Sequence, residues 1–273
     1  MNISVITVPY HLGKKDVSYG KAPQVLLDAG IVDNLLQAGH VVSVLTVEIE
    51  DVEPFDENEA VTQVNGALAR LVGDVVARGD FPLVVAGNCN HSLGMLAGFN
   101  APDIGVVWFD AHSDLNTRET SPTGYYDGMA LALSMRAEFA PTRDAVGMGF
   151  TVAPERVVLV GTRDLDPGER DYIDATGIEV AGTDIDRALQ CIQQLDAEKI
   201  YVHVDLDTLD PAHFSALGFP TPDGLSPEQV KTVLAATKDR MAGLLITSLD
   251  PEHDSAEQAI RIAGELAIFG LIT

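Results

Sequence analysis

Short and nearly uninterrupted runs of apolar residues recur along the chain and predict β-strands that are buried on both faces. Most runs are rich in valine and isoleucine and do not alternate with polar residues, which is typical of strands inside a parallel sheet. They cover residues 3–8, 41–47, 82–86, 104–109, 156–160, 178–181, 200–204 and 244–247, with a further candidate at 268–272. The pattern therefore predicts a central sheet.

Helical periodicity appears between these runs. Residues 22–37 have apolar side chains at helical spacing, and the segments 59–77, 186–195, 227–237 and 256–266 follow a similar pattern. Ser226 precedes Pro227, which is the N-cap and first-turn pattern of a helix start. The alternation of strands and helices predicts an α/β fold with helices on both faces of the sheet. No Ser/Gly-rich linker divides the chain, so we expect residues 1–273 to form a single domain.

The composition is ordinary for a globular protein, but the charge is not. Of the 273 residues, 46% are hydrophobic and 21% are charged, and 17 Lys+Arg stand against 41 Asp+Glu, a formal net charge of -24. Such a surface repels phosphate backbones and anionic membranes, so we expect neither a nucleic-acid nor a membrane partner. Metals, amines and guanidines are favoured as ligands. Acidity that serves only solubility explains the composition equally well.

The two cysteines, Cys89 and Cys191, do not make a disulfide framework. The first residues have no basic region followed by a long apolar stretch, so no signal peptide is predicted. No apolar run approaches the about 20 residues of a membrane span. We expect a cytoplasmic protein.

Two acidic segments follow predicted strands and carry potential metal ligands. The run 104–109 leads directly into Asp110-Ala111-His112-Ser113-Asp114, and the run 200–204 leads into Asp205 and Asp207. In extended backbone, residues two apart share one face, so a single cleft can receive them. A polar turn is the alternative for either segment alone. Buried carboxylates are costly without compensation, and a divalent cation supplies it.

A histidine, His91, follows the predicted strand 82–86 in the segment Gly87–Ser92. A lone histidine is more often structural, but the two aspartate segments make a ligand role more attractive. Carboxylate and imidazole ligands with little sulfur suit manganese, and could also hold iron, cobalt or zinc. The number of aspartates favours two ions, and two ions about 3.5–4 Å apart can activate one bridging water.

Together these segments resemble the motifs of the ureohydrolase family, which includes arginase and agmatinase. Asp110–Asp114 is similar to the family's DAHxD motif, Asp205–Pro211 is similar to DxDxxDP, and Gly87–Ser92 lies where the family has GGDHS. Their order and spacing match the family over nearly the whole chain. The resemblance implies a three-layer, arginase-like α/β fold with a mainly parallel eight-stranded sheet, and two Mn²⁺ ions per chain.

The resemblance also implies roles for the metal-site residues. One ion would have the ligands His91, Asp110, Asp114 and Asp205. The other would have the ligands His112, Asp110, Asp205 and Asp207, so that Asp110 and Asp205 bridge the two ions. Asp114 would also orient a bridging hydroxide, which attacks the guanidine-type carbon before an amine is lost.

Four further residues match the family's substrate-binding positions. Asp166 and Glu169 match the residues that hold the substrate's α-amino group, and Asn116 and Thr123 match those that receive its α-carboxylate. Asp166 to Glu169 can also start a helix, and both roles are compatible. The expected substrate is therefore a small guanidino α-amino acid rather than agmatine, which lacks the carboxylate.

The glutamate that orients the guanidinium in the family corresponds to Glu252. The local spacing is one residue short, so His253 is an alternative.

Three features depart from the family pattern. Asp127 stands where arginase has a histidine proton shuttle. An aspartate, with an ordinary pKa of about 3.9 against about 6.5 for histidine, donates protons poorly at neutral pH unless burial raises its pKa. Asn88-Cys89-Asn90 replaces Gly-Gly-Asp, and Cys89 could pack inertly, contact the metal site or ligate an ion as a thiolate. The chain also lacks the carboxyl-terminal extension of trimeric arginases, so we expect a monomer or a small homo-oligomer.

These departures lead to the expected activity. The resemblance implies a dinuclear manganese hydrolase from a branch of the family that converts Nω-hydroxy-L-arginine to L-ornithine and hydroxyurea in D-cycloserine antibiotic biosynthesis. Ordinary arginase activity, which yields L-ornithine and urea, is the first alternative, and an agmatinase-like ureohydrolase is the second. The non-enzymatic alternative is a metal-binding regulatory protein on the same scaffold.

Overall fold

The middle layer of the protein is an eight-stranded sheet in which every pair of neighbouring strands is parallel. The computed structural model describes residues 1–50, 55–253 and 256–272. The strand order is β4-β1-β5-β10-β9-β6-β7-β8. These strands are β1 (Asn2–Val8), β4 (Val41–Thr46), β5 (Phe81–Ala86), β6 (Gly105–Phe109), β7 (Val157–Val160), β8 (Glu179–Gly182), β9 (Ile200–Asp205) and β10 (Met241–Thr247). A separate two-stranded hairpin joins β2 (Tyr10–His11) to β3 (Lys14–Lys15).

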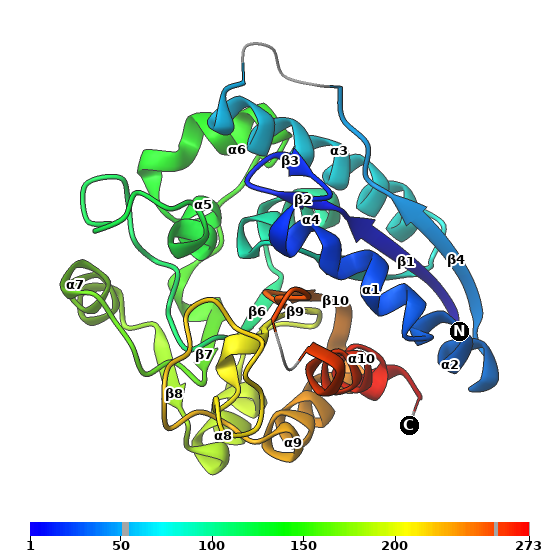
Figure 1. The fold of residues 1–273 in the computed structure, drawn as a ribbon. Coiled ribbons are helices and arrows are strands. Elements are labelled where there is room, and N and C mark those ends of the chain that lie inside the picture. The colour runs from blue at the N-terminus through cyan, green and yellow to red at the C-terminus, as the bar shows by residue number, and fades with distance from the viewer. Residues whose placement is uncertain (51–54, 254–255, 273) are drawn as a thin grey trace.

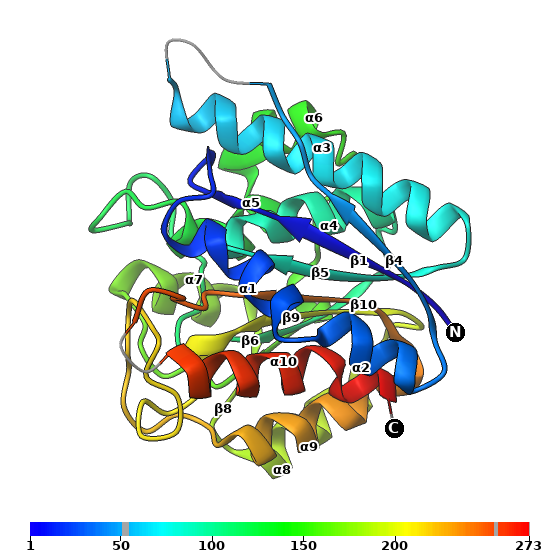
Figure 2. The same cartoon turned by 45° about the vertical axis from the view of Figure 1, so that its right-hand side comes forward.

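Helices cover both faces of this sheet and complete a three-layer α/β fold, as the sequence predicts (Figures 1 and 2). One layer contains α3 (Glu57–Ala77), α4 (Ser92–Phe99), α5 (Ala130–Met135) and α6 (Ala140–Val146). The opposite layer contains α1 (Ala22–Asp28), α2 (Ile31–Gln37), α8 (Ile185–Gln194), α9 (Pro227–Thr237) and α10 (Ala256–Ile272). The remaining helix, α7 (Pro167–Thr176), contributes Ile173 to the core of the first layer.

Burial explains why the strand-forming runs lack alternation. Every residue of the inner strands β5, β6 and β9 is buried, whereas most residues of the edge strand β4 are exposed. A strand covered by helices on both faces places both of its side-chain rows in apolar surroundings. The eight runs predicted between residues 3 and 247 all correspond to strands of the sheet.

Two predicted elements are wrong. The apolar run 268–272 is not a strand but the last turns of α10, where Ile268 and Leu271 are buried in the core. A short continuous apolar run does not distinguish a strand from a buried helix. The predicted helix over 22–37 is two helices, because Gly30 adopts the left-handed conformation with φ 87 and ends the first one.

The sheet topology brings the chemically interesting segments to one edge. Strands β5, β10, β9 and β6 are neighbours in that order. After its carboxyl end, β5 leads into the short helical turn η2 (Cys89–His91) and β10 leads into Ser248. Likewise, β9 leads into the turn η6 (Leu206–Thr208) and β6 leads into Asp110. Because all four strands are parallel, these segments meet at the same edge, which is where open α/β sheets bind ligands.

The packing of α3 against α4 holds the first of these segments in place. Asn65 of α3 accepts a hydrogen bond from the Gly94 amide at 2.9 Å and donates one to Asn90 at 3.3 Å. Glycine permits this approach, since a Cβ at Gly98 would lie 2.5 Å from the Cβ of Val72 and 2.8 Å from the Ala69 carbonyl oxygen.

We predict that Gly98→Ala destabilises the protein by about 1–3 kcal/mol, the usual cost of overpacking a close helix contact. The matched control is Gly66→Ala in α3, where a Cβ would meet only the tip of Arg70 at 4.0 Å. This control is expected to stabilise the protein by about 0.5–1 kcal/mol through helix propensity. Urea unfolding of both variants measures the difference, and equal stabilities would contradict the proposed close packing.

Candidate metal centre

A cavity of about 250 Å³ opens at the carboxyl edge of the sheet. Its lining includes most of the residues that the sequence singled out: His112, Asp114, Asn116, Thr123, Asp127, Asp166, Glu169, Asp205 and Asp207. Cys89 lines the same cavity. The topology therefore brings together side chains that are separated by more than a hundred residues in the sequence.

The strand ends hold the aspartates through local hydrogen bonds. Asp110 accepts the His112 amide at 2.7 Å, and Asp205 accepts the Asp207 amide at 2.7 Å. Asp207 accepts the Ala111 amide at 2.9 Å, which joins the two segments. In both acidic segments, a carboxylate at the strand end caps the turn that follows it.

One group of potential ligands comprises Asp110, His112 and Asp207, whose ligand atoms lie within 4.8 Å of one another. The Nδ1 atom of His112 is 3.3 Å from Asp110 Oδ1 and 3.0 Å from Asp207 Oδ2. Burial alone would lower the pKa of His112, but its hydrogen bonds to these two carboxylates raise that pKa to about 12. The protonated His112 ring therefore compensates part of the negative charge of these carboxylates.

The four aspartates Asp110, Asp114, Asp205 and Asp207 concentrate negative charge in a buried place. Each is at most 6% exposed. Burial and then mutual repulsion raise the pKa of all four carboxyl groups, that of Asp205 to about 8 and that of Asp207 to about 6. Asp114 Oδ2 has no hydrogen-bond partner among the described residues. A buried cluster with these properties fits divalent cations, which remove both the repulsion and the orphaned oxygen.

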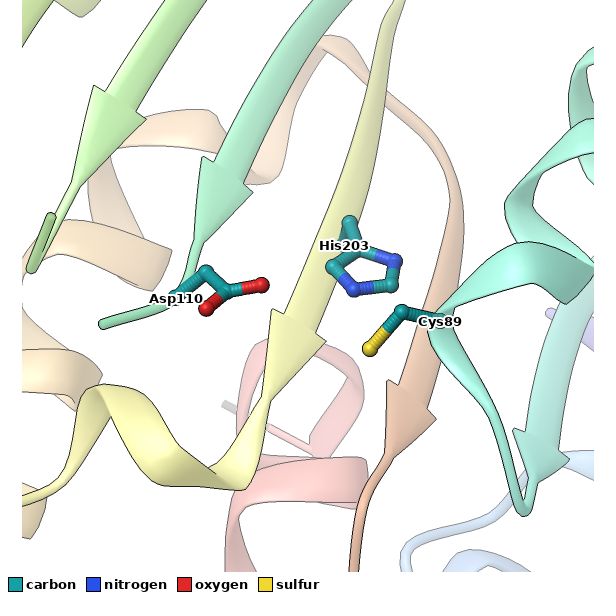
Figure 3. A group of neighbouring side chains, drawn as sticks. All are labelled: Cys89, Asp110 and His203. Atoms are coloured by element: carbon teal, nitrogen blue, oxygen red, sulfur yellow. The ribbon is translucent and has the colours of Figure 1, made fainter. Parts of the chain in front are cut away.

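Cys89 belongs to a second group of potential ligands, together with Asp110 and His203 (Figure 3). Its Sγ atom lies 2.7 Å from Asp205 Oδ2, and Ser248 Oγ donates to the same oxygen at 2.5 Å. Burial raises the pKa of the Cys89 thiol, so without a cation it remains protonated and donates to the carboxylate. The geometry thus shows Cys89 in contact with the aspartate cluster.

His91, in contrast, is not brought to the aspartates, although the sequence predicted it as a ligand. Its ring is fully buried, with Nε2 3.5 Å from the Tyr10 carbonyl oxygen, and burial lowers its pKa to about 4. His91 is absent from the described residues that line the cavity. Cys89 and His91 are the two ends of the turn η2, and residues two apart in a 3₁₀ turn point in different directions. The sequence signal that could have indicated Cys89 as a site residue is its position shortly after the buried strand β5.

Asp127 lies in the cavity wall, at the start of the turn η3 (Asp127–Met129), and is held by two asparagines. It accepts hydrogen bonds from the Asn88 side chain, from the Asn90 amide at 3.2 Å and from Asn90 Nδ2 at 2.7 Å. Burial raises the pKa of Asp127, and these hydrogen bonds oppose the rise. Both oxygens accept N–H groups, and these hydrogen bonds favour the ionised form of the carboxyl group.

The predicted substrate-binding residues form one wall of the cavity. Asn116 Nδ2 donates to Asp166 Oδ2 at 2.8 Å, and Thr123 lies on the same lining. Glu169 is 3% exposed and accepts from Ser113 Oγ at 2.7 Å and from the Leu115 amide at 3.0 Å.

Glu169 also forms a capping box with Asp166 at the start of α7. The helix-start interpretation is therefore confirmed. Since both oxygens of Glu169 already accept hydrogen bonds, this residue holds the wall in shape.

Glu252 and His253 lie outside the described lining of the cavity. The Glu252 side chain is 59% exposed and forms an ion pair with Lys21 Nζ at 2.6 Å. His253 is also exposed. The strand β10 ends at Thr247, before both residues, and the next residue, Ser248, has a left-handed backbone conformation with φ 66.

Aromatic residues from distant segments complete the cavity, and periodicity did not reveal them. Tyr19, Tyr125 and Phe219 line it, and the rings of Tyr125 and Phe219 have their centroids 6.1 Å apart. Burial raises the pKa of the Tyr19 and Tyr125 phenols, so both are neutral. Gly218 makes room for Tyr19, because a Cβ there would lie 1.9 Å from the Tyr19 hydroxyl.

Comparison with known proteins agrees with this geometry. Residues 1–271 match the Arginase family. The chain is 31% identical to the arginase of Bacillus caldovelox over 97% of both chains. It is also 34% identical to the N(omega)-hydroxy-L-arginine amidinohydrolase of Streptomyces lavendulae, over 68% of this chain and 67% of that one. The crystal structure of arginase from Bacillus subtilis superposes with a TM-score of 0.89 at 30% identity, covering 100% of this chain and 98% of that one.

In the part of the chain that the structure describes, no helix has both the length and the apolar character of a membrane span. The match to the sequence family, the eight-stranded parallel sheet and the buried carboxylate cluster agree in what they indicate. The chain belongs to the arginase family, a family of metal-dependent hydrolases that act on amidines.

Proposed function

We propose that this protein hydrolyses the guanidino group of an arginine-type α-amino acid and that Nω-hydroxy-L-arginine is its preferred substrate, giving L-ornithine and hydroxyurea. The observation that carries the preference is Asp127, a hydrogen-bond acceptor in the cavity wall where arginase has a histidine. The partial relative from Streptomyces lavendulae, which is named for this substrate, adds support.

The cluster fits two divalent metal ions, and we propose manganese. The proposed ligands are Cys89, Asp110, His112, Asp114, Asp205 and Asp207, with Cys89 in the role first expected of His91. Asp110 belongs to both ligand groups, and Asp205 lies between Cys89 and Asp207, so these two aspartates are the proposed bridges. When bound, the ions would lower the pKa of a water molecule enough for it to act as a nucleophile near neutral pH.

The cavity wall supplies the groups that recognise an α-amino acid. Asp166 offers a carboxylate to the α-amino group, and the amide of Asn116 and the hydroxyl of Thr123 offer donors to the α-carboxylate. Asp114 Oδ2, which is buried and unpaired among the described residues, is available to accept a proton from the attacking water. In this proposal Glu169 acts by fixing Asp166 and the segment around Leu115.

Asp127 separates the two substrate candidates. Its oxygens accept N–H groups from Asn88 and Asn90, so it is poorly suited to protonate a leaving amine. An N-hydroxyguanidine is less basic than a guanidine and carries an O–H group that can donate to a carboxylate. The hydroxylated substrate therefore depends less on a proton donor of the enzyme. Its hydroxyl group also finds a hydrogen-bond acceptor in Asp127.

L-Arginine is the second candidate substrate, with urea and L-ornithine as products. It is favoured by whole-length similarity, because the relative from Bacillus caldovelox is named arginase and matches 97% of this chain.

The substrate proposal predicts that the manganese-loaded protein prefers Nω-hydroxy-L-arginine to L-arginine by about 100-fold in kcat/KM, which corresponds to about 2.7 kcal/mol of transition-state stabilisation. Ornithine release measures both reactions in one assay. Agmatine serves as the control, since it lacks the carboxylate that Asn116 and Thr123 would bind. A preference for L-arginine would instead establish the second candidate.

Removing a proposed bridging ligand is expected to abolish turnover and metal retention together. For Asp110→Asn and Asp205→Asn we expect a loss of activity beyond the about 10–100-fold that follows the loss of an outer hydrogen-bond partner. Metal analysis after gel filtration should find fewer than two ions per chain. The matched control is Asp174→Asn on the exposed side of α7. Full activity and full metal content in either bridge variant would rule out the proposed centre.

The metal-free protein is expected to lose stability as the pH rises from about 6.5 to about 8. The folded chain holds protons on Asp205 up to a pKa of about 8 and on Asp207 up to about 6, whereas unfolded aspartate has a pKa of about 3.9. Above about pH 6.5 the buried, neutral His91 and His203 are neutral in the unfolded chain as well, so there the folded state binds more protons and each rise in pH favours unfolding. We expect a loss of at least about 1.4 kcal/mol, the equivalent of one pKa unit.

Thermal unfolding in EDTA at the two pH values measures this effect, and added Mn²⁺ should restore more stability at the higher pH. Asp205→Asn should have a shallower pH dependence because it lacks one titrating group. A metal-free protein that is equally stable at both values would contradict the electrostatic account of the cluster.

A further inference from the structure

A buried pair of rings lies beside the metal centre and has no part in the chemistry proposed so far. Trp108 of β6 and His203 of β9 are paired in register in the sheet. Their rings stack with centroids 3.6 Å apart and an angle of 6° between the planes, and both side chains are fully buried. Figure 3 shows His203 next to Cys89 and Asp110.

Trp108 forms a hydrogen bond with the proposed metal ligand Asp110. Its indole Nε1–H donates to Asp110 Oδ2 at 3.1 Å. Because the other carboxylate oxygen accepts the His112 amide, the orientation of Asp110 is determined by two N–H groups. His203 stacks on the same indole, so it is held rigidly by the neighbour that orients Asp110.

The hydrogen bond from Tyr201 decides where His203 carries its proton. The Tyr201 hydroxyl lies 3.2 Å from His203 Nδ1, and this is the hydroxyl's one hydrogen bond among the described residues. If Nδ1 carried the proton, the buried hydroxyl would have to accept it and would leave its own proton unpaired. The arrangement that satisfies both groups has Tyr201 donating to Nδ1, and in a neutral imidazole the proton then lies on Nε2.

The other nitrogen, Nε2, is buried and has no hydrogen-bond partner among the described residues. A ring nitrogen of His203, the Cys89 sulfur and an Asp110 oxygen all lie within 4.8 Å of one another. A buried N–H group without an acceptor is unfavourable, so the environment calls for an acceptor that the metal-free protein does not provide. The sulfur of a metal-bound cysteine is such an acceptor, since it no longer carries a proton to donate to Asp205.

We propose that His203 is a positioning residue that donates an Nε2–H···S hydrogen bond to Cys89 when this cysteine ligates a metal ion, and that Tyr201 selects the donor tautomer. The inference rests on the proposed ligand role of Cys89. The hydrogen bond holds the sulfur toward the ion and reduces its electron donation, in the way that partners behind a ligand tune a metal site. Trp108 and His203 thus form a rigid pair of donors, one for each of two neighbouring ligands.

Cobalt-loaded protein provides a readout other than activity, because a cysteine ligand gives a sulfur-to-cobalt charge-transfer band in the ultraviolet. We expect this band in the unchanged protein and its loss in Cys89→Ser. In His203→Leu the band should shift to lower energy, since a sulfur without its hydrogen bond donates more strongly, and the cobalt dissociation constant should rise about 10–100-fold. His203→Gln, which can still offer an N–H donor, should restore part of both changes.

Tyr201→Phe removes only the hydroxyl and tests the tautomer if His203→Leu does not fold. It should give a smaller shift in the same direction, while Tyr172→Phe, a hydroxyl deletion on α7, should give none. A band that depends on Cys89 but is unchanged in His203→Leu and Tyr201→Phe would overturn the role of His203. If the unchanged protein has no band that depends on Cys89, the proposed ligand set itself is wrong and the inference falls with it.

Discussion

The repulsion among four buried carboxylates at one edge of the sheet is the constraint on which the rest of the site depends. Asp110, Asp114, Asp205 and Asp207 are nearly inaccessible to water, so neither solvent nor salt screens them effectively. His112 and a few backbone amides compensate part of the charge. A divalent cation would balance such a cluster, and the family to which the chain belongs is metal-dependent. Much of the surrounding structure can be understood as holding these groups close together.

The departures from the family motif form one connected unit rather than separate substitutions. Asn88 and Asn90 both donate to Asp127, and Asn90 accepts from Asn65 in the next layer. Between the two asparagines, Cys89 points to the carboxylates. The acceptor Asp127 is thus matched by amide donors at 88 and 90, on either side of the proposed sulfur ligand. A single substitution back to the family residue at one of these positions would leave buried partners unsatisfied.

In the opposite wall, one residue, Glu169, connects two structural segments. Glu169 caps α7 and binds two groups of the segment that follows the DAHSD motif. The start of α7 is thus tied to the segment that follows strand β6. Asp166, the aspartates Asp114, Asp205 and Asp207, and the aromatic side chains of Tyr19, Tyr125 and Phe219 line the same cavity.

The sequence by itself determined the layer architecture and the edge of the sheet at which the site lies. Runs buried on both faces, helical spacing and acidic residues directly after strands are local patterns, and parallel strands bring their carboxyl ends together by geometry. Continuous apolar runs are ambiguous, however, so 268–272 was assigned to a strand although it ends α10.

Only the tertiary structure decided which side chains face the cavity. Cys89 and His91 lie two residues apart in one turn, and packing against Tyr10 takes the imidazole away while the thiol meets Asp205. Glu252 lies beyond a turn that directs it to Lys21 and solvent. Periodicity specifies direction along a regular strand or helix, but in a turn the direction of a side chain depends on the neighbours that surround it, and those come from distant parts of the chain.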